Sequence, residues 1–169
     1  RVSFETATMP KETVRSTIGS LPPSGTSGDE LHDIRIKFTD KVMEIIKLIP
    51  KDGGSRRNLG EEYQLPCHKN NDGFKDVYGR MKWDDVSPTI TGGCNNPSKG
   101  RFLHPEENRE ITLREAALLQ TFPPDYKFSL KNGKSKVALM IGNALPPKFI
   151  KYHAKTLLKN IQGVVSDEQ

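Results

Sequence analysis

The chain has 169 residues, of which 34% are hydrophobic and 28% charged, and its mean hydropathy is −0.63. This low apolar content predicts a modest core, and no apolar run approaches the roughly 18 residues of a membrane span. A start without an apolar signal segment and only two cysteines make membrane, secreted and collagen-like proteins poor fits, so we expect a cytoplasmic protein.

The positive charge gathers toward the C-terminal end. Lys and Arg total 26 against 21 Asp and Glu, giving a net charge of +5 and a pI of about 9.2. Residues 127–159 contain eight lysines and no acidic residue. Such a cluster is either a solvated face or a surface that meets phosphate, and charge alone favours the solvated face.

The N-terminal third is predicted to be a connector followed by a helix. The first residue is Arg rather than Met, so we expect a fragment, a processed piece or a natural subunit. Prolines and the Ser/Gly-rich residues 24–28 predict an extended or flexible connector over residues 1–38. Apolar residues at helical spacing over residues 42–49 predict a helix that Pro50 ends, and a glycine-rich loop then leads to Arg56 and Arg57.

The middle of the chain favours strands. Residues 74–83, 89–91 and 101–104 are rich in β-prone residues and are separated by glycine and proline. They alternate poorly, which predicts a small irregular sheet. The fold class expected from the sequence is therefore α+β, with a small, irregular β-rich lobe.

Two helices are predicted after residue 110. Thr112 and Glu115 form a capping-box pattern for a helix that Pro123 and Pro124 stop. The final helix is expected to begin at Pro146–Pro147 and end at Gly163, with an apolar stripe along one side.

No catalytic or metal cluster emerges from the residue types. Cys67 next to His68 resembles a nucleophile beside a base, but sequence neighbours need not face each other, and an ordinary loop cysteine is preferred. Cys67, His68, Cys94 and His104 lack the paired spacing of zinc ligands, so no metal is expected.

Two polar loops remain as candidate ligand sites. Residues 141–147 combine a Gly-Asn turn with a following helix start, which can present N–H groups and an amide to a polar ligand. Residues 87–93 offer hydroxyls and flexible backbone near basic side chains, as DNA-backbone contacts often do. From the residue types alone, an ordinary turn explains residues 141–147 about as well as a ligand site does. For residues 87–93 an ordinary strand and loop is the better explanation.

The combination of motifs resembles the cytosine-C5 DNA methyltransferase family. Residues 114–123 (REAALLQTFP) are similar to the ninth conserved block of that family, and residues 142–147 (GNALPP) to its tenth. Residues 101–105 (RFLHP) resemble the approach to the ninth block. Thr89-Ile90 stands where the target recognition region carries a Thr followed by an aliphatic residue.

This resemblance implies the C-terminal portion of a two-lobed enzyme. It divides the chain into a connector (1–38), a target recognition domain (39–110), the ninth- and tenth-block helices (111–165) and a tail (166–169). The last helix would return to a Rossmann-like methyltransferase lobe that this chain lacks. The cofactor-binding Phe-x-Gly-x-Gly block, the Pro-Cys-Gln nucleophile loop and the Glu-Asn-Val block do not occur in the sequence, so the chain alone is expected to be inactive.

The resemblance also assigns roles to residues. Thr89 would contact a phosphate near the flipped nucleotide, with Ile90 supporting that loop, while Asn143 and Ala144 would line part of the S-adenosylmethionine pocket. Charge and position, rather than matched motifs, add further expected contacts to DNA: Arg80, Lys82, Lys99, Arg56 and Arg57. One of these arginines is a candidate reader of guanine.

The expected function is DNA target recognition within a DNA (cytosine-5-)-methyltransferase, in a bacterial restriction–modification setting and near the nucleoid. The enzyme would transfer a methyl group from S-adenosylmethionine to a flipped cytosine. The partners would be double-stranded DNA and a catalytic lobe, supplied by the same chain or by a second subunit. A non-catalytic DNA-binding module, the small subunit of a split methyltransferase and a tRNA-directed relative remain alternatives.

Overall fold

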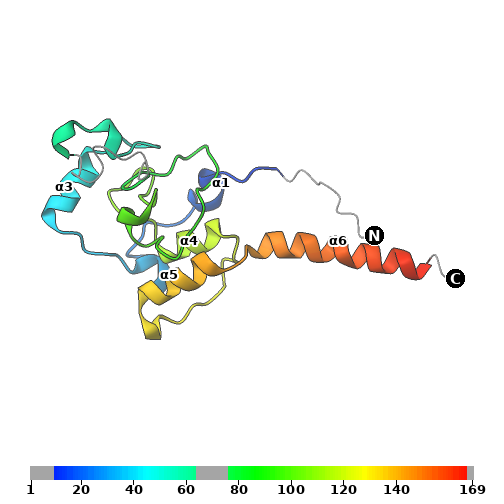
Figure 1. The fold of residues 1–169 in the computed structure, drawn as a ribbon. Helices are drawn as coiled ribbons and strands as arrows, with labels where there is room; N and C mark the ends of the chain where they lie inside the picture. The colour runs from blue at the N-terminus through cyan, green and yellow to red at the C-terminus, as the bar shows by residue number, and fades with distance from the viewer. Residues whose placement is uncertain (1–9, 64–75, 167–169) are drawn as a thin grey trace.

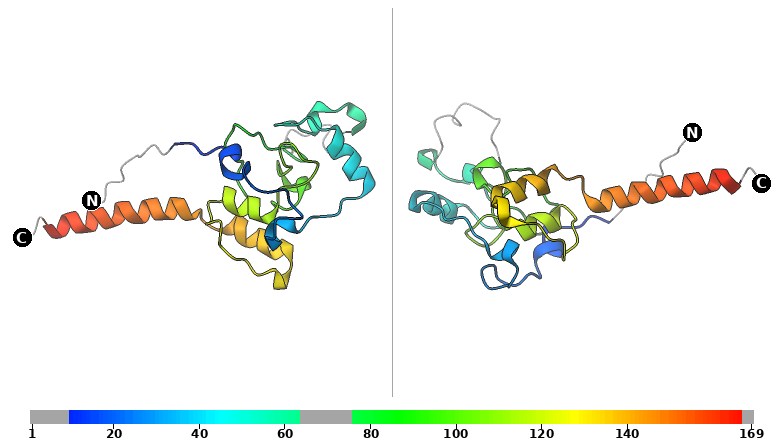
Figure 2. Two further views of the ribbon diagram at one scale, coloured as in Figure 1. Left: turned by 180° about the vertical axis from the view of Figure 1, so that it is seen from behind. Right: turned by 90° about the horizontal axis from the view of Figure 1, so that it is seen from below.

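Helices provide nearly all the regular structure in the computed structural model, which describes residues 10–63 and 76–166. The described α-helices are α1 (Val14–Ile18), α2 (Glu30–Asp33), α3 (Asp40–Leu48), α4 (Leu113–Leu119), α5 (Lys134–Asn143) and α6 (Pro147–Ser166). Single 3-10 turns lie between them: η1 (Arg56–Asn58), η2 (Glu61–Tyr63), η5 (Pro97–Lys99) and η6 (Leu130–Asn132). Helices α1 to α5 and the intervening loops pack together, whereas α6 projects outward as a single long rod (Figures 1 and 2).

The prediction of a β-rich lobe is wrong for the described part of the chain. Its β pairing is limited to two isolated bridges, a parallel one between Arg80 and Leu103 and an antiparallel one between Leu103 and Glu110. Turns and breaks at glycine and proline interrupt the β-prone segments, and arginine side chains bind carbonyl groups in and beside them. Arg101 Nη1, for example, donates to the carbonyl oxygens of Gly53 and Arg80 at 2.8 and 2.9 Å.

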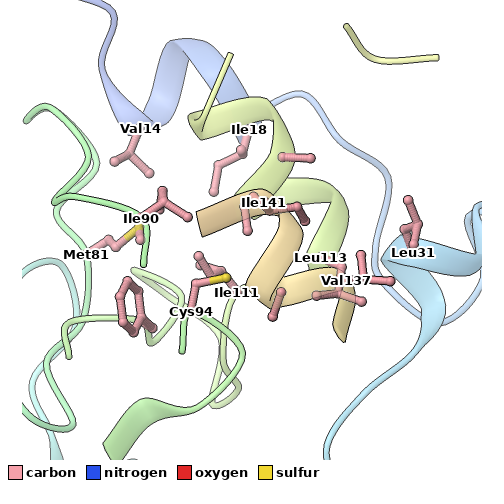
Figure 3. Close-up of a cluster of buried hydrophobic side chains, with 14 residues drawn as sticks. Val14, Ile18, Leu31, Met81, Ile90, Cys94, Ile111, Leu113, Val137 and Ile141 are labelled. Carbon is pink, nitrogen blue, oxygen red and sulfur yellow. The ribbon is translucent and has the colours of Figure 1, made fainter. Parts of the chain in front are cut away.

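The main core lies where α1, α4 and α5 meet the loops of the middle segment (Figure 3). Val14 and Ile18 of α1 and Leu31 of α2 are buried in it. The segment predicted to be an extended connector therefore contributes three core side chains. From the loops come Met81, Ile90, Cys94, Phe102 and Ile111.

A second, smaller core holds α3 against the loops. The predicted helix over residues 42–49 is confirmed, with Ile49 as its C-cap. Ile46, Ile49 and Leu103 are fully buried there, and partly buried apolar residues surround them. This packing fixes the C-terminal end of α3 next to the chain around residue 103.

The predicted capping box at the start of α4 is confirmed. The Thr112 hydroxyl accepts the Glu115 N–H at 3.1 Å, and the Glu115 carboxylate accepts the Thr112 N–H at 2.7 Å. The helix ends at Leu119, before the prolines, because Thr121 adopts a left-handed φ of 68°. The N–H groups of Thr121 and Phe122 turn back to the carbonyls of Leu118 and Ala117, a Schellman arrangement that usually has glycine in place of Thr121.

Two boundaries near the C-terminal end differ from the sequence prediction. Residues 142 and 143, expected in a turn, are the last residues of α5, a helix that was not predicted. Val137, Ala138 and Ile141 are its buried face, and this spacing is the signal that identifies it. Helix α6 begins at Pro147 as expected but continues to Ser166, beyond Gly163.

Candidate nucleic-acid and cofactor site

The loop that carries Thr89 is anchored by its neighbour. Ile90 is 3% exposed and belongs to the main core, where it lies near Met81 and Ile141 (Figure 3). Thr89 itself is exposed. Thr89 is therefore exposed on a loop that its buried neighbour holds in place, which suits a contact between its hydroxyl and a DNA phosphate.

The last turn of α5 packs directly against this loop. A Cβ atom built on Gly142 would overlap the backbone of Thr91 and Gly92, so the two backbones touch. Asn143, next in the chain, is exposed, and its Oδ1 lies 3.8 Å from a Cβ position built on Gly92. The Ala144 carbonyl accepts a hydrogen bond from Gln120 Nε2 at 2.7 Å. The structure thus brings together the two polar segments that the sequence singled out.

Arg80 lies in the protein interior, whereas the sequence predicted it as a surface contact to DNA. It is 0% exposed, and all five of its N–H groups are used within the protein. They reach the carbonyls of Ile46, Ile49, His104 and Glu107 and the Asn108 side chain. Burial lowers the pKa of this guanidinium. Arg80 is therefore unavailable to DNA in this structure, and its expected role as a groove contact is corrected to a structural one.

The carbonyls that Arg80 binds explain why a cation is buried there. Ile46 and Ile49 lie at the C-terminal end of α3, where helix carbonyls lack intrahelical partners and carry partial negative charge. The guanidinium satisfies them and ties α3 to the segment around His104 and Glu107.

The other predicted basic contacts divide into two groups. The stem of Lys99 runs beside Gly93 at the end of the Thr89 loop, and Lys82 lies beside Gly53 in the glycine-rich loop. Both lysines are exposed, and so is Arg57. Arg56 is half-buried, donates from Nε to the Tyr63 carbonyl and lies 5.5 Å from the centre of the Tyr78 ring.

A buried cluster of charged residues underlies α4. Arg109 Nη1 and Nη2 each donate to a Glu115 oxygen at 2.8 Å, and Arg109 also binds the Glu107 carboxylate in bidentate fashion. Burial, the largest single effect, raises the pKa of Glu115, but the hydrogen bonds and positive charge of Arg109 and the N–H of Thr112 act together to hold the pKa below its usual value. Glu115 is thus committed to capping α4 and binding Arg109, so its role is architectural.

His104 belongs to the same cluster and is neutral. Burial, aided by the charge of Arg109, lowers its pKa to about 4. Its Nδ1 accepts the N–H groups of Glu106 and Glu107 at 3.2 and 3.0 Å, which requires an unprotonated nitrogen. In the sequence His104 lacks the paired spacing of a zinc ligand, and nothing near it in the chain indicates this buried cluster.

Within the described residues no group of three or more metal-binding side chains occurs. Cys94 is fully buried, and burial raises the pKa of its thiol to about 12. Cys67 and His68 lie outside the described residues. No described helix is both long and apolar enough to cross a membrane.

Comparisons with known proteins agree with the motifs. Residues 2–159 match the family model "C-5 cytosine-specific DNA methylase". The chain is 41% identical over 161 residues to the "Type II methylase M.HgiDII" of Herpetosiphon aurantiacus, covering 90% of this chain and 45% of the relative. It is 35% identical over 164 residues to the "DNA (cytosine-5)-methyltransferase 3" of Arabidopsis thaliana, covering 80% of this chain and 12% of that protein. The chain therefore spans less than half the length of these relatives.

Proposed function

Because the chain belongs to the C-5 cytosine-specific DNA methylase family, we propose that it is the C-terminal, DNA-recognising part of a DNA (cytosine-5-)-methyltransferase. The complete enzyme would transfer a methyl group from S-adenosylmethionine to C5 of a cytosine flipped out of the DNA helix. The observation that carries the proposal is the backbone contact between the Thr89 loop and the end of α5. It joins a segment suited to DNA phosphate with one suited to the cofactor.

The proposed enzyme needs a second lobe for its chemistry. The Pro-Cys-Gln, Glu-Asn-Val and Phe-x-Gly-x-Gly blocks do not occur in this sequence, and the chain spans 45% of M.HgiDII. We assign these functions to a Rossmann-like lobe, in the same chain or in a partner subunit, and expect this chain alone to be inactive. Residues 39–110 would form the target recognition segment and residues 111–165 the returning helices, although both share one core.

Helix α6 supports the need for such a lobe. It has 20 residues, about 30 Å of helix, and projects from the remainder of the structure (Figure 1). Its described large apolar residues are about half exposed: Phe149, Ile150, Leu157, Leu158 and Ile161. An amphipathic helix gains most of its stability by burying its apolar face against other elements. We assign the catalytic lobe as the surface that covers α6.

The residues at the end of α5 fit a partial cofactor pocket. Asn143 has an exposed amide that can donate and accept hydrogen bonds, which suits the hydroxyl, amino and carboxylate groups of S-adenosylmethionine. Ala144 would line the pocket beside Asn143. Gln120 fixes the Ala144 backbone by donating a hydrogen bond to its carbonyl oxygen. When bound, the cofactor supplies the methyl group, and this chain supplies only part of its binding surface.

DNA would be held mainly through its backbone. Thr89 would donate its hydroxyl to a phosphate, and the exposed Lys82, Lys99 and Arg57 would add positive charge. Arg56, half-buried beside Tyr78, would contribute from the same glycine-rich loop as Arg57. Ile90 would act only by anchoring Thr89.

The test is methyl transfer from labelled S-adenosylmethionine to duplex DNA by the complex that this chain forms in its own cells. We expect incorporation into cytosine by the complex and none by the purified chain alone. DNA binding without incorporation would favour a non-catalytic DNA-binding module, and transfer to tRNA in place of DNA would favour a tRNA-directed enzyme.

Two substitutions in the complete enzyme separate the proposed roles. Thr89→Ala is expected to weaken binding of all duplexes by about two- to tenfold, the value of one hydrogen bond, while Thr89→Ser retains the hydroxyl and the affinity. Asn143→Ala is expected to raise the KM for S-adenosylmethionine more than the KM for DNA. A sequence-selective defect in the first variant, or the reverse order of KM changes in the second, would contradict these assignments.

A further inference from the structure

Gly142 makes an unusually close approach to another part of the chain. A Cβ atom at this position would lie inside contact distance of Gly92 N and of the Thr91 carbonyl carbon and oxygen. All three are backbone atoms, so no side chain can turn away to make room. Gly142 lies within α5 and does not adopt a left-handed φ, and alanine forms helices better than glycine. The need for glycine here therefore comes from the contact and not from the backbone conformation.

The opposite side of the contact is more tolerant. A Cβ atom on Gly92 would meet the Leu139 Cδ1 atom at 2.7 Å, while the nearest backbone atom, Leu139 Cα, lies at 3.4 Å. Leu139 is 42% exposed, so the end of its side chain has room to move. Gly92 and Gly142 thus face each other across one contact, but only a substitution at Gly142 forces the two backbones apart.

The contact joins the two ends of the proposed site. Asn143 directly follows Gly142, and Thr89 precedes the Thr91–Gly92 backbone by two residues. Ile141 and Ile90, on either side, are both buried in the main core (Figure 3). A displacement of the loop relative to α5 therefore changes the separation of Thr89 from Asn143.

The geometry points to Gly142 as a positioning residue that sets this separation and so couples binding of DNA to binding of S-adenosylmethionine. This inference rests on the function proposed above. DNA would hold the Thr89 loop, and S-adenosylmethionine would hold the end of α5. Because the two segments touch at Gly142, holding one of them also positions the other for its ligand. Such coupling is reciprocal, and it commonly changes the affinity for each ligand by about 5- to 150-fold.

The test compares Gly142→Ala with Gly92→Ala in the complete enzyme. The dissociation constant for a duplex is measured with and without S-adenosylhomocysteine, a non-reactive probe for the cofactor site. In the unaltered enzyme and in Gly92→Ala we expect the probe to tighten DNA binding at least fivefold. In Gly142→Ala we expect this ratio to fall to about one and kcat to fall by about 10- to 100-fold, the scale expected for misplacement by about 1 Å.

A second measurement requires no substitution, in case Gly142→Ala does not fold. Hydrogen exchange of the Thr91, Gly92 and Gly93 amides is followed in the unaltered complete enzyme, and the probe is expected to slow it. Unchanged exchange with the probe demonstrably bound would overturn the role of Gly142, as would equal coupling in the two alanine variants. Absence of both probe binding and methyl transfer would instead refute the proposed function, and the inference with it.

Discussion

Replacing Arg80 by methionine tests whether this residue supports the fold or contacts DNA. Methionine retains most of the length and the apolar volume of the side chain but none of its five donors. Three of the acceptors, the carbonyls of Ile46, Ile49 and His104, are in buried hydrogen bonds with Arg80. The other two lie in partly buried contacts that water can replace.

The expected loss of stability follows from these carbonyls. Each buried acceptor left without a partner costs about 1–3 kcal/mol, or roughly 3–9 kcal/mol for the three. Removing a buried cation also removes its desolvation penalty, which is several kcal/mol and offsets part of that cost. We therefore expect a net loss of about 3 kcal/mol, equivalent to a fall in Tm of roughly 6–12 °C for a chain of this size.

Thermal unfolding of the chain and duplex binding by the complete enzyme are the two assays. The matched control is Lys82→Met, which removes an exposed cation two residues away and is expected to leave Tm unchanged while weakening DNA binding. The reasoning fails if Arg80→Met keeps the Tm of the unaltered chain but loses DNA affinity, because the guanidinium would then be a DNA contact.

Two further predictions concern pH and the junction before α6. The folded-state pKa of His104 is about 4 against an ordinary 6.5, so protons favour the unfolded chain, and lowering the pH from 7 to 5 should cost about 2 kcal/mol of unfolding free energy. Denaturant titrations at both pH values should show that His104→Gln loses less unfolding free energy between pH 7 and pH 5 than the unaltered chain. An equal loss in the two proteins would refute the assignment. Thr121 has a left-handed backbone, and its hydroxyl accepts the Lys148 N–H at 3.1 Å. Asparagine tolerates this backbone better and keeps an acceptor, so Thr121→Asn should raise the free energy of unfolding by about 1 kcal/mol. Thr121→Val, which keeps the β-branch but loses the acceptor, should destabilise by about as much in the same titrations, and the opposite order would exclude strain at this residue.

Local signals in the sequence predicted the parts of the fold that depend on neighbouring residues. The capping box of Thr112 and Glu115 needs only a spacing of three, and the helix at α3 needs only its apolar period and Pro50. The start of α6 followed from its prolines in the same way. In each of these cases the stabilising partners lie within one or two helical turns.

The features that the sequence did not predict depend on contacts between residues far apart in the chain. Arg80 appeared as one basic residue in a β-prone segment, but its acceptors come from residues 24 to 34 positions away in the chain. Arg101 likewise binds the carbonyl groups of Gly53 and Arg80, 48 and 21 positions away in the chain. At the candidate site, the motifs identified both segments, but their contact through Gly142 appeared only in three dimensions.

The distribution of arginine and lysine between interior and surface bears on how this chain would recognise DNA. Arg80, Arg109 and Arg114 are buried, and their guanidinium groups bind carbonyls or carboxylates of the protein. Lys82 and Lys99 remain exposed. Arginine reads guanine by a bidentate fork, whereas lysine acts as a point charge that binds phosphate without regard to sequence. Binding through these lysines would therefore add salt-dependent affinity to every duplex alike, and base selectivity would have to come from other groups, among which Arg57 is an exposed arginine.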